Sequence, residues 1–137
     1  MNLYLFSSAL LFLGTLFGIF VKNSKKPLYS FLLIFISSSV GLIQAAESLA
    51  TGCTTEVNLA SWQPIGDVIL RIDPLSAFFL MITYIGSIIA SLYAIDYLKK
   101  YENSRQFSLL CFSFNSLVLS MVLLLTMQNI FAFLIVW

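Results

Sequence analysis

The sequence predicts an all-α integral membrane protein with four transmembrane helices, the start of a fifth, the N-terminus outside, and a short outer β-hairpin between helices two and three. Of the 137 residues, 60% are hydrophobic and 9% are charged, whereas an ordinary soluble domain carries about 25% charged residues. The apolar residues form long runs, and most basic residues lie in two short loops between these runs. We therefore expect residues 1–137 to form one membrane domain that crosses the plasma membrane several times.

Four apolar runs have about the 20 residues that a helix needs to cross a bilayer. They lie at about 2–21, 28–46, 74–98 and 107–127. The first run has no charge before it and lysines after it instead of a small-residue cleavage site, so we expect a retained helix and not a signal peptide. A fifth apolar run, 129–137, would cover only about 13 Å of a hydrocarbon core about 30 Å thick. It is predicted to be the start of a further helix.

The basic residues predict the orientation of these helices. Six of the seven lie in the loops after the first and third helices: Lys22, Lys25, Lys26, Lys99, Lys100 and Arg105. The connection 47–73 between the second and third helices holds four acidic residues and a single basic one, Arg71. The positive-inside rule places the two basic loops in the cytoplasm, so the N-terminus and the connection 47–73 lie outside.

The outer connection 47–73 contains two segments with the alternation of a β-strand. The segment VILRID, at 68–73, alternates clearly, and VNLASW, at 57–62, alternates more weakly. Pro64 and Gly66 between them suit a turn. The pattern predicts a short hairpin on the outer membrane surface, and an ordered loop without strand pairing is the alternative.

The third helix has a clear start. Asp73 can accept hydrogen bonds from the first N–H groups of the helix, and Pro74 suits the first helical position because it lacks an N–H. A negative charge there also suits the positive end of the helix dipole. We interpret Asp73 as a helix cap.

Polar residues inside the predicted helices are the candidates for function. Asn115 and Ser116 lie near the middle of the fourth helix, where amides and hydroxyls either bond to other helices or line a hydrated ion path. Asp96 lies near the cytoplasmic end of the third helix, where it either pairs with Lys100 four residues later or belongs to an ion path.

The residue inventory excludes most site chemistry. The chain has no histidine and two cysteines that lie far apart, so it offers no metal cluster and no Ser-His-Asp or Cys-His set. We expect no catalytic, metal or cofactor-binding site. The net charge of +1, without a basic stripe, does not indicate nucleic acid as a partner.

Two stretches resemble a known membrane family. The run ILRIDPLSAFFLMITYIGSIIASLYAIDYLKKY resembles the third membrane helix of the antiporter-like proton-conducting subunits. These subunits occur in respiratory complex I, in the hydrogenase-4 and formate hydrogenlyase membrane arms, and in multisubunit cation/proton antiporters. The stretch FNSLVLSMVLLLTMQNIFAFLIVW is similar to their fourth helix and the opening of their fifth, and the pieces RIDPLSAFF and FLIVW look nearest to the hydrogenase-4 component B branch.

The resemblance implies an N-terminal fragment of a larger subunit. In the family, the tryptophan equivalent to Trp137 is followed directly by a membrane-embedded glutamate, whose lysine partner lies on a later helix. None of these ion-path residues can be mapped onto this chain, so the fragment alone is expected to be inactive. The intact subunit would couple redox chemistry elsewhere to H⁺ or Na⁺ transport. It would be a non-catalytic part of an oxidoreductase complex, without a cofactor of its own, and its partners would be other membrane subunits of a hydrogenase- or complex I-like assembly.

Two other classes of protein remain as alternatives. One is a complete small four-helix membrane protein with an assembly or regulatory role, although the short run 129–137 neither spans a bilayer nor has an amphipathic polar face. The other is a small-molecule exporter, for which a buried charge within the helices would be expected.

The predicted orientation can be checked by thiol labelling. Cys53 should react from outside with a membrane-impermeant thiol reagent in intact cells, and Cys111 should not. Labelling of Cys53 only after cell lysis would contradict the orientation.

Overall fold

The computed structural model describes residues 2–20, 26–62, 66–97 and 105–137 and contains five helices and a two-stranded hairpin in this part of the chain. In chain order the elements are α1 (Asn2–Phe20), α2 (Lys26–Thr51), β1 (Thr55–Trp62), β2 (Gly66–Ile72), α3 (Pro74–Tyr97), α4 (Arg105–Leu124) and α5 (Ile130–Val136). The predicted helices and the predicted hairpin are therefore present and follow one another in the expected order.

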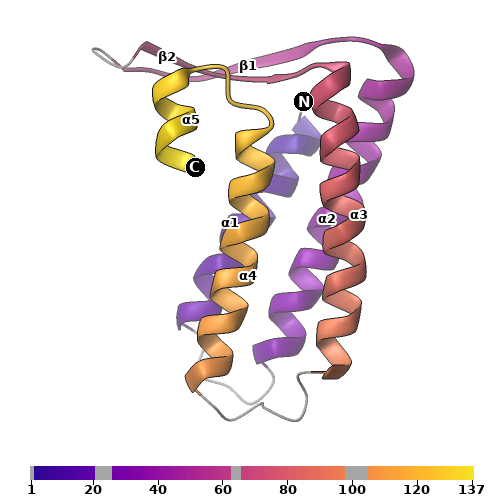
Figure 1. The fold of residues 1–137 in the computed structure, drawn as a ribbon, viewed down its shortest axis with the longest axis vertical. Coiled ribbons are helices and arrows are strands. Elements are labelled where there is room, and N and C mark those ends of the chain that lie inside the picture. The colour runs from indigo at the N-terminus through magenta and orange to yellow at the C-terminus, as the bar shows by residue number, and fades with distance from the viewer. Residues whose placement is uncertain (1, 21–25, 63–65, 98–104) are drawn as a thin grey trace.

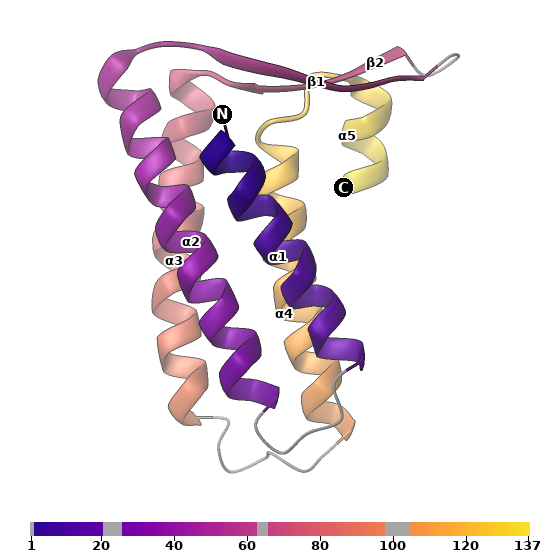
Figure 2. The same cartoon turned by 180° about the vertical axis from the view of Figure 1, so that it is seen from behind.

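The long helices α1 to α4 form an up-and-down bundle, and the hairpin lies across one end of it (Figures 1 and 2). Helix α2 packs against both α1 and α3, and α1 packs against α4, whereas α3 and α4 touch one another much less. The short helix α5 turns back from the hairpin end and runs beside α4. We call the two ends of the bundle the hairpin end and the opposite end.

The hairpin is antiparallel and carries one irregularity. The register runs from Thr55 opposite Ile72 to Trp62 opposite Gly66, with a bulge between Asn58 and Ala60. Gly66, the first residue of β2, has a φ of +90°, a conformation that favours glycine. One face of β2 lies on the bundle, because the side chains of Leu70 and Ile72 are buried in its core.

The C-terminal ends of α2 and α4 differ most from the predicted helix boundaries. Helix α2 continues past Ala46 to Thr51, so the start of the predicted outer connection is helical. The helix ends where Gly52 adopts a φ of +64° and its N–H donates to the carbonyl of Ser48, as in a glycine-capped C-terminus. Helix α4 ends at Leu124, before the predicted end at Met127, because the following backbone pairs with β2.

The bundle exposes many large apolar side chains and buries many polar ones beside its apolar core. Large apolar side chains cover the outside: Ile89, Tyr93 and Leu109, for example, are 64%, 67% and 70% exposed. The interior combines an apolar core, which includes Leu11, Ile34 and Leu80, with many buried serines and with Asn115 and Thr126. An apolar exterior around small and polar interior residues is typical of helices packed within lipid.

Two helical segments in the described residues are long and apolar enough to span a membrane, Tyr29–Thr51 and Pro74–Tyr97. The apolar segments Leu3–Leu16 and Leu109–Leu124, in α1 and α4, are shorter. The four predicted spans therefore correspond to four helices, of which two reach spanning length in the part of the chain that the structure describes.

The ends of the helices agree with the predicted pairing of loops. Helices α1 and α3 end, and α2 and α4 begin, at the opposite end of the bundle (Figures 1 and 2). Of the basic residues in the two connecting loops, Lys22, Lys25, Lys99 and Lys100 lie outside the described residues. The orientation relative to the membrane stays a prediction.

The two cysteines differ in exposure, which sharpens the labelling experiment. Cys53 is exposed beside the hairpin, whereas Cys111 is buried in α4 and would resist labelling from either side. A better cytoplasmic control is Ser104→Cys in a Cys53→Ser background, since Ser104 belongs to the second predicted basic loop. This variant should react only after the membrane is opened.

The side chain of Asp73, the residue before α3, caps the first turn of this helix. Its Oδ1 accepts from the backbone N–H of Ser76 at 2.7 Å, the geometry of an N-cap. The hydroxyl and the backbone N–H of Ser76 hold the pKa of the Asp73 carboxyl below its ordinary value. A carboxylate whose pKa is lower in the folded state stabilises that state above the pKa of the unfolded chain. This stabilisation is lost as the pH falls through the folded pKa.

Replacing Asp73 with alanine should destabilise the fold by about 0.5–2 kcal/mol at neutral pH, because the first turn of α3 loses its cap. The difference from the wild type should begin to shrink below about pH 4, where the aspartate of the unfolded chain becomes protonated, and should shrink further as the pH falls through the lower pKa of the folded state. Asp73→Asn is the matched control: it keeps a capping oxygen, so its loss should be smaller and independent of pH in this range. The measurement is the midpoint of SDS-induced unfolding, followed by circular dichroism at several pH values. A pH-independent loss in Asp73→Ala would show that the charge does not contribute.

Candidate functional site

The candidate site is the polar interior of the bundle, which we define by its buried polar side chains. They come from all four long helices and the segment after α4: Ser7, Thr15, Ser30, Ser37, Ser38, Gln44, Ser48, Ser87, Ser91, Asn115 and Thr126. The buried polar residues in the described part of the chain include no Asp, Glu, Lys or Arg. The polar interior is thus built from hydroxyls and amides.

Asn115 joins three helices near the middle of the bundle. Its side chain is fully buried, and its Nδ2 donates to Ser30 Oγ on α2 at 2.8 Å and to the Cys111 carbonyl at 2.9 Å. Its Oδ1 accepts no conventional hydrogen bond. A Cβ added to Gly14 of α1 would lie 2.7 Å from this oxygen, so a Cα–H of Gly14 points towards it. Such C–H···O contacts recur where helices approach closely.

A second group of contacts joins α1 to α2 and α4 nearer the hairpin. Ser37 Oγ on α2 donates to the backbone carbonyl of Ser7 at 2.6 Å. The Tyr4 hydroxyl lies 2.7 Å from Thr126 Oγ1. Either hydroxyl can be the donor in this pair, because the Tyr4 hydroxyl can also donate to the Val122 carbonyl at 3.5 Å and that of Thr126 to the Leu123 carbonyl at 3.0 Å. These bonds hold α1 between its two neighbours.

Tyr84 and Gly41 form a tight contact between α2 and α3. A Cβ at Gly41 would collide with the ring of Tyr84, so the absence of a side chain there lets the ring lie on the backbone of α2. The Tyr84 hydroxyl is buried near Ser7 but makes no hydrogen bond of good geometry. The contact between Gly41 and the Tyr84 ring therefore depends on shape complementarity and not on a hydrogen bond.

Backbone hydrogen bonds join the hairpin to the segment after α4, and we call this pairing the seam. The Arg71 N–H donates to the Thr126 carbonyl at 2.9 Å, and the Gln128 N–H donates to the Ile69 carbonyl at 3.1 Å. Leu70 and Met127 form an isolated antiparallel bridge between these bonds. Through the seam, β2 pairs on its second edge with a single bridge residue, Met127.

Asn129 links the seam to α5. Its Oδ1 accepts from the N–H groups of Phe131 and Ala132 at 2.9 and 3.4 Å, so it caps α5. Its Nδ2 donates to the Asp67 carbonyl of β2 at 3.2 Å. The start of α5 is thereby fixed to the hairpin.

The predicted candidate residues do not form one site. Asn115 lies at the centre of the polar interior, and Ser116 beside it is partly exposed. Asp96 is exposed near the end of α3 that is far from the hairpin, and its proposed partner Lys100 lies outside the described residues. Sequence reasoning did not identify Tyr4, Thr126 or Asn129, although Asn129 before an apolar run is a recognisable helix-start signal.

The contacts of the polar interior hold helices together. In the described residues, no group of His, Cys, Asp and Glu could hold a metal ion. The one ion pair found there, between Arg71 Nε and Glu56 Oε1 at 3.4 Å, lies on the hairpin with both side chains partly exposed and lacks hydrogen-bond geometry. It contributes little, because exposed ion pairs are screened by water.

The contact between Gly14 and Asn115 can be tested by adding one carbon. Gly14→Ala should destabilise the bundle by about 1–3 kcal/mol, because the new methyl group would displace the Asn115 amide from Ser30. Ala9→Ser is the matched control, since it adds one heavy atom at an exposed position of the same helix. Unfolding by SDS, followed by tryptophan fluorescence, measures both variants. Equal stability of Gly14→Ala and the wild type would mean that α1 and α4 do not approach this closely.

One curated protein is similar to almost all of the chain. No protein-family model matches this chain. The chain is 32% identical over 136 residues to hydrogenase-4 component B of Escherichia coli (strain K12). The match covers 98% of this chain and 19% of that protein, so the chain spans about a fifth of the length of the curated relative it matches. The similarity therefore supports the hydrogenase-4 component B family only in the sense that this chain resembles a fragment of such a protein.

Proposed function

We propose that residues 1–137 form the first part of a membrane subunit of the hydrogenase-4 component B type, which couples redox chemistry elsewhere to H⁺ or Na⁺ transport. The observation that carries the proposal is the similarity to hydrogenase-4 component B over 98% of the chain. The order of four long helices with a hairpin between the second and third is compatible with it.

In this proposal, α1 to α4 cross the plasma membrane with the N-terminus and the hairpin outside. The apolar exterior of the bundle supports burial in lipid, where exposed leucines and isoleucines are favourable. The loops rich in lysine join helices at the opposite end of the bundle, which supports a cytoplasmic location for that end.

The role of this segment in the subunit is to serve as a framework. A path for ions through lipid needs groups that can carry or stabilise a charge, since each apolar layer otherwise opposes it strongly. The segments 28–46 and 107–137 contain no Asp, Glu, Lys, Arg or His. Asn115 and its partners hold helices in place, and the titratable groups of the path belong to the remainder of the larger subunit. The partners are neighbouring membrane subunits and a peripheral oxidoreductase arm.

Residues 1–137 alone should therefore show no proton transport. Reconstituted in liposomes with an imposed pH gradient, they should leak protons no faster than protein-free vesicles. An affinity tag on the whole subunit, in membranes of the source cells, should recover hydrogenase-type subunits together with it. Gly14→Ala, which disrupts the framework, should reduce this recovery, and Ala9→Ser should not.

Two results would contradict the proposal. Specific and saturable proton flux through residues 1–137 would mean that the path lies within this segment, and Asp96 would then need a new interpretation. Recovery of the chain without any subunit of an oxidoreductase complex would favour a free-standing small membrane protein.

A further inference from the structure

Helices α2 and α3 meet along two stripes of buried residues. On each helix the stripe recurs every three or four residues, which keeps it on one face. The stripe of α2 consists of Ile34, Ser38, Gly41, Ala45 and Ser48, and that of α3 consists of Ala77, Leu80, Tyr84, Ser87 and Ser91. The ring of Tyr84 lies on Gly41, and the two helices run in opposite directions (Figures 1 and 2). Ser38, about one turn before Gly41, therefore lies opposite the turn of α3 between Tyr84 and Ser87.

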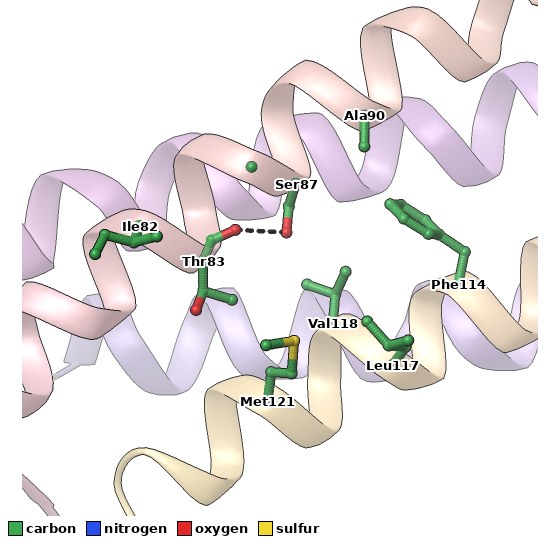
Figure 3. A pocket seen from close by; sticks show the side chains of 9 residues that line it. Ile82, Thr83, Ser87, Ala90, Phe114, Leu117, Val118 and Met121 are labelled. Atoms are coloured by element: carbon green, nitrogen blue, oxygen red, sulfur yellow. Dashed lines mark hydrogen bonds between the residues drawn. The ribbon is translucent and has the colours of Figure 1, made fainter.

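The hydroxyl of Ser38 lacks a hydrogen bond to its own helix. Serines in helices often donate to a carbonyl three or four residues earlier. Ser39 donates in this way to the Phe35 carbonyl at 2.7 Å, and Ser87 donates to the Thr83 carbonyl at 2.8 Å, as Figure 3 shows. Ser38 is fully buried, yet its Oγ has no hydrogen-bond partner in the part of the chain that the structure describes. Its hydroxyl is thus available to a group that lies between the helices.

The hydroxyl of Tyr84 lies on the same contact and also lacks a partner. The Tyr84 side chain is fully buried, and its hydroxyl makes no hydrogen bond within the described residues. The ring carbon that carries this hydroxyl is the atom nearest to a Cβ placed on Gly41. The Cβ positions of Ser38 and Gly41, three residues apart on one helix face, are separated by about 5–6 Å. One small molecule that makes two hydrogen bonds of about 2.8 Å each spans such a distance.

Two buried hydroxyls without a partner would destabilise the contact between α2 and α3. A hydroxyl that is buried without a hydrogen bond costs free energy, and neither an apolar core nor lipid offers it a partner. Water is the ligand that suits this place, because a water molecule can donate and accept hydrogen bonds, as each hydroxyl can. The buried polar residues of the described chain include no Asp, Glu, Lys or Arg, so no charged side chain would hold an ion there instead.

We infer that Tyr84 and Ser38 bind one water molecule between α2 and α3. The water bridges the two hydroxyls, and Ser7 of α1, which lies near the Tyr84 hydroxyl, brings a third helix to the same place. The bridge adds hydrogen bonds to a contact in which Gly41 and the Tyr84 ring contribute shape complementarity. The inference does not depend on the proposed function, because both hydroxyls are buried within the described residues.

X-ray footprinting of the protein in its native membrane tests this water site. The X-ray pulse converts water into hydroxyl radicals, which oxidise the side chains beside that water, so a buried residue is modified only where water is bound. Tyr4 is the matched control, because it is also buried and its hydroxyl lies 2.7 Å from Thr126 Oγ1. Mass spectrometry should show that Tyr84 is oxidised several-fold faster than Tyr4. Leu80, buried one turn away on the same stripe, should stay unmodified, which distinguishes a bound water from an opening of the helices.

Removing one of the two hydroxyls that hold the water should reduce this oxidation. Ser38→Ala should lower the oxidation rate of Tyr84 several-fold. Ser39→Ala is the matched control: it removes a hydroxyl that is bonded within α2, and it should leave the oxidation rate of Tyr84 unchanged. Oxidation of Tyr84 no faster than that of Tyr4, or an equal fall in both serine variants, would overturn the inference.

Thermal unfolding of the purified protein, followed by circular dichroism, gives a second measurement whose sign depends on the water. With the water bound, Tyr84→Phe loses a hydrogen bond and should lower the midpoint of unfolding by a few degrees. Without the water, the same change removes an unpartnered buried hydroxyl, so the midpoint should stay the same or rise. Tyr93→Phe, at a side chain that is 67% exposed, is the control and should have no effect. An unchanged or higher midpoint for Tyr84→Phe would refute the water site.

Discussion

The seam between β2 and the segment after α4 is the constraint on which the arrangement of the hairpin end depends. Two backbone hydrogen bonds, from Arg71 to Thr126 and from Gln128 to Ile69, take the chain out of the helix at Leu124. Backbone groups at a helix end need partners when they are shielded from water, and β2 supplies them here. The same pairing lets Asn129 reach the Asp67 carbonyl and start α5 in a new direction.

The polar interior of the bundle suits the membrane setting that we propose for it. In hydrocarbon, burial of leucine between helices gains little, so close approach and hydrogen bonds decide which helices associate. Gly14 and Gly41 permit close approach to Asn115 and Tyr84, while Ser37 bonds to the carbonyl of Ser7. These contacts pack α1 and α2 closely against each other and against their neighbours. The side of α3 that carries Gly86 lacks a neighbour of this kind within the described residues.

Features that depend on local residues could be predicted from the sequence. The alternation in VILRID gave the hairpin, and Asp73 before Pro74 gave the start of α3. The end of α2 at Thr51 was missed although Gly52 is a recognisable C-terminal signal. The end of α4 could not be predicted, because Thr126 and Met127 continue an apolar run and leave the helix only through pairing with β2. Asn115 was recognised as a candidate, but its contacts with Ser30 and Gly14 depend on how three helices align. No pattern within one helix contains that information.

The seam also constrains the order in which the chain can assemble. Its partners, Ile69–Arg71 and Thr126–Gln128, are separated by the whole of α3 and α4, so the contact is distant in sequence. During synthesis, β2 is made before its second partner and presents an unpaired strand edge, which is a site for pairing with other chains. Only when α4 has formed does the segment after it return to the hairpin and cover this edge. The edge of β2 thus stays uncovered until α4 and the segment after it have been made, and we expect this part of the chain to be most prone to misassembly during that interval.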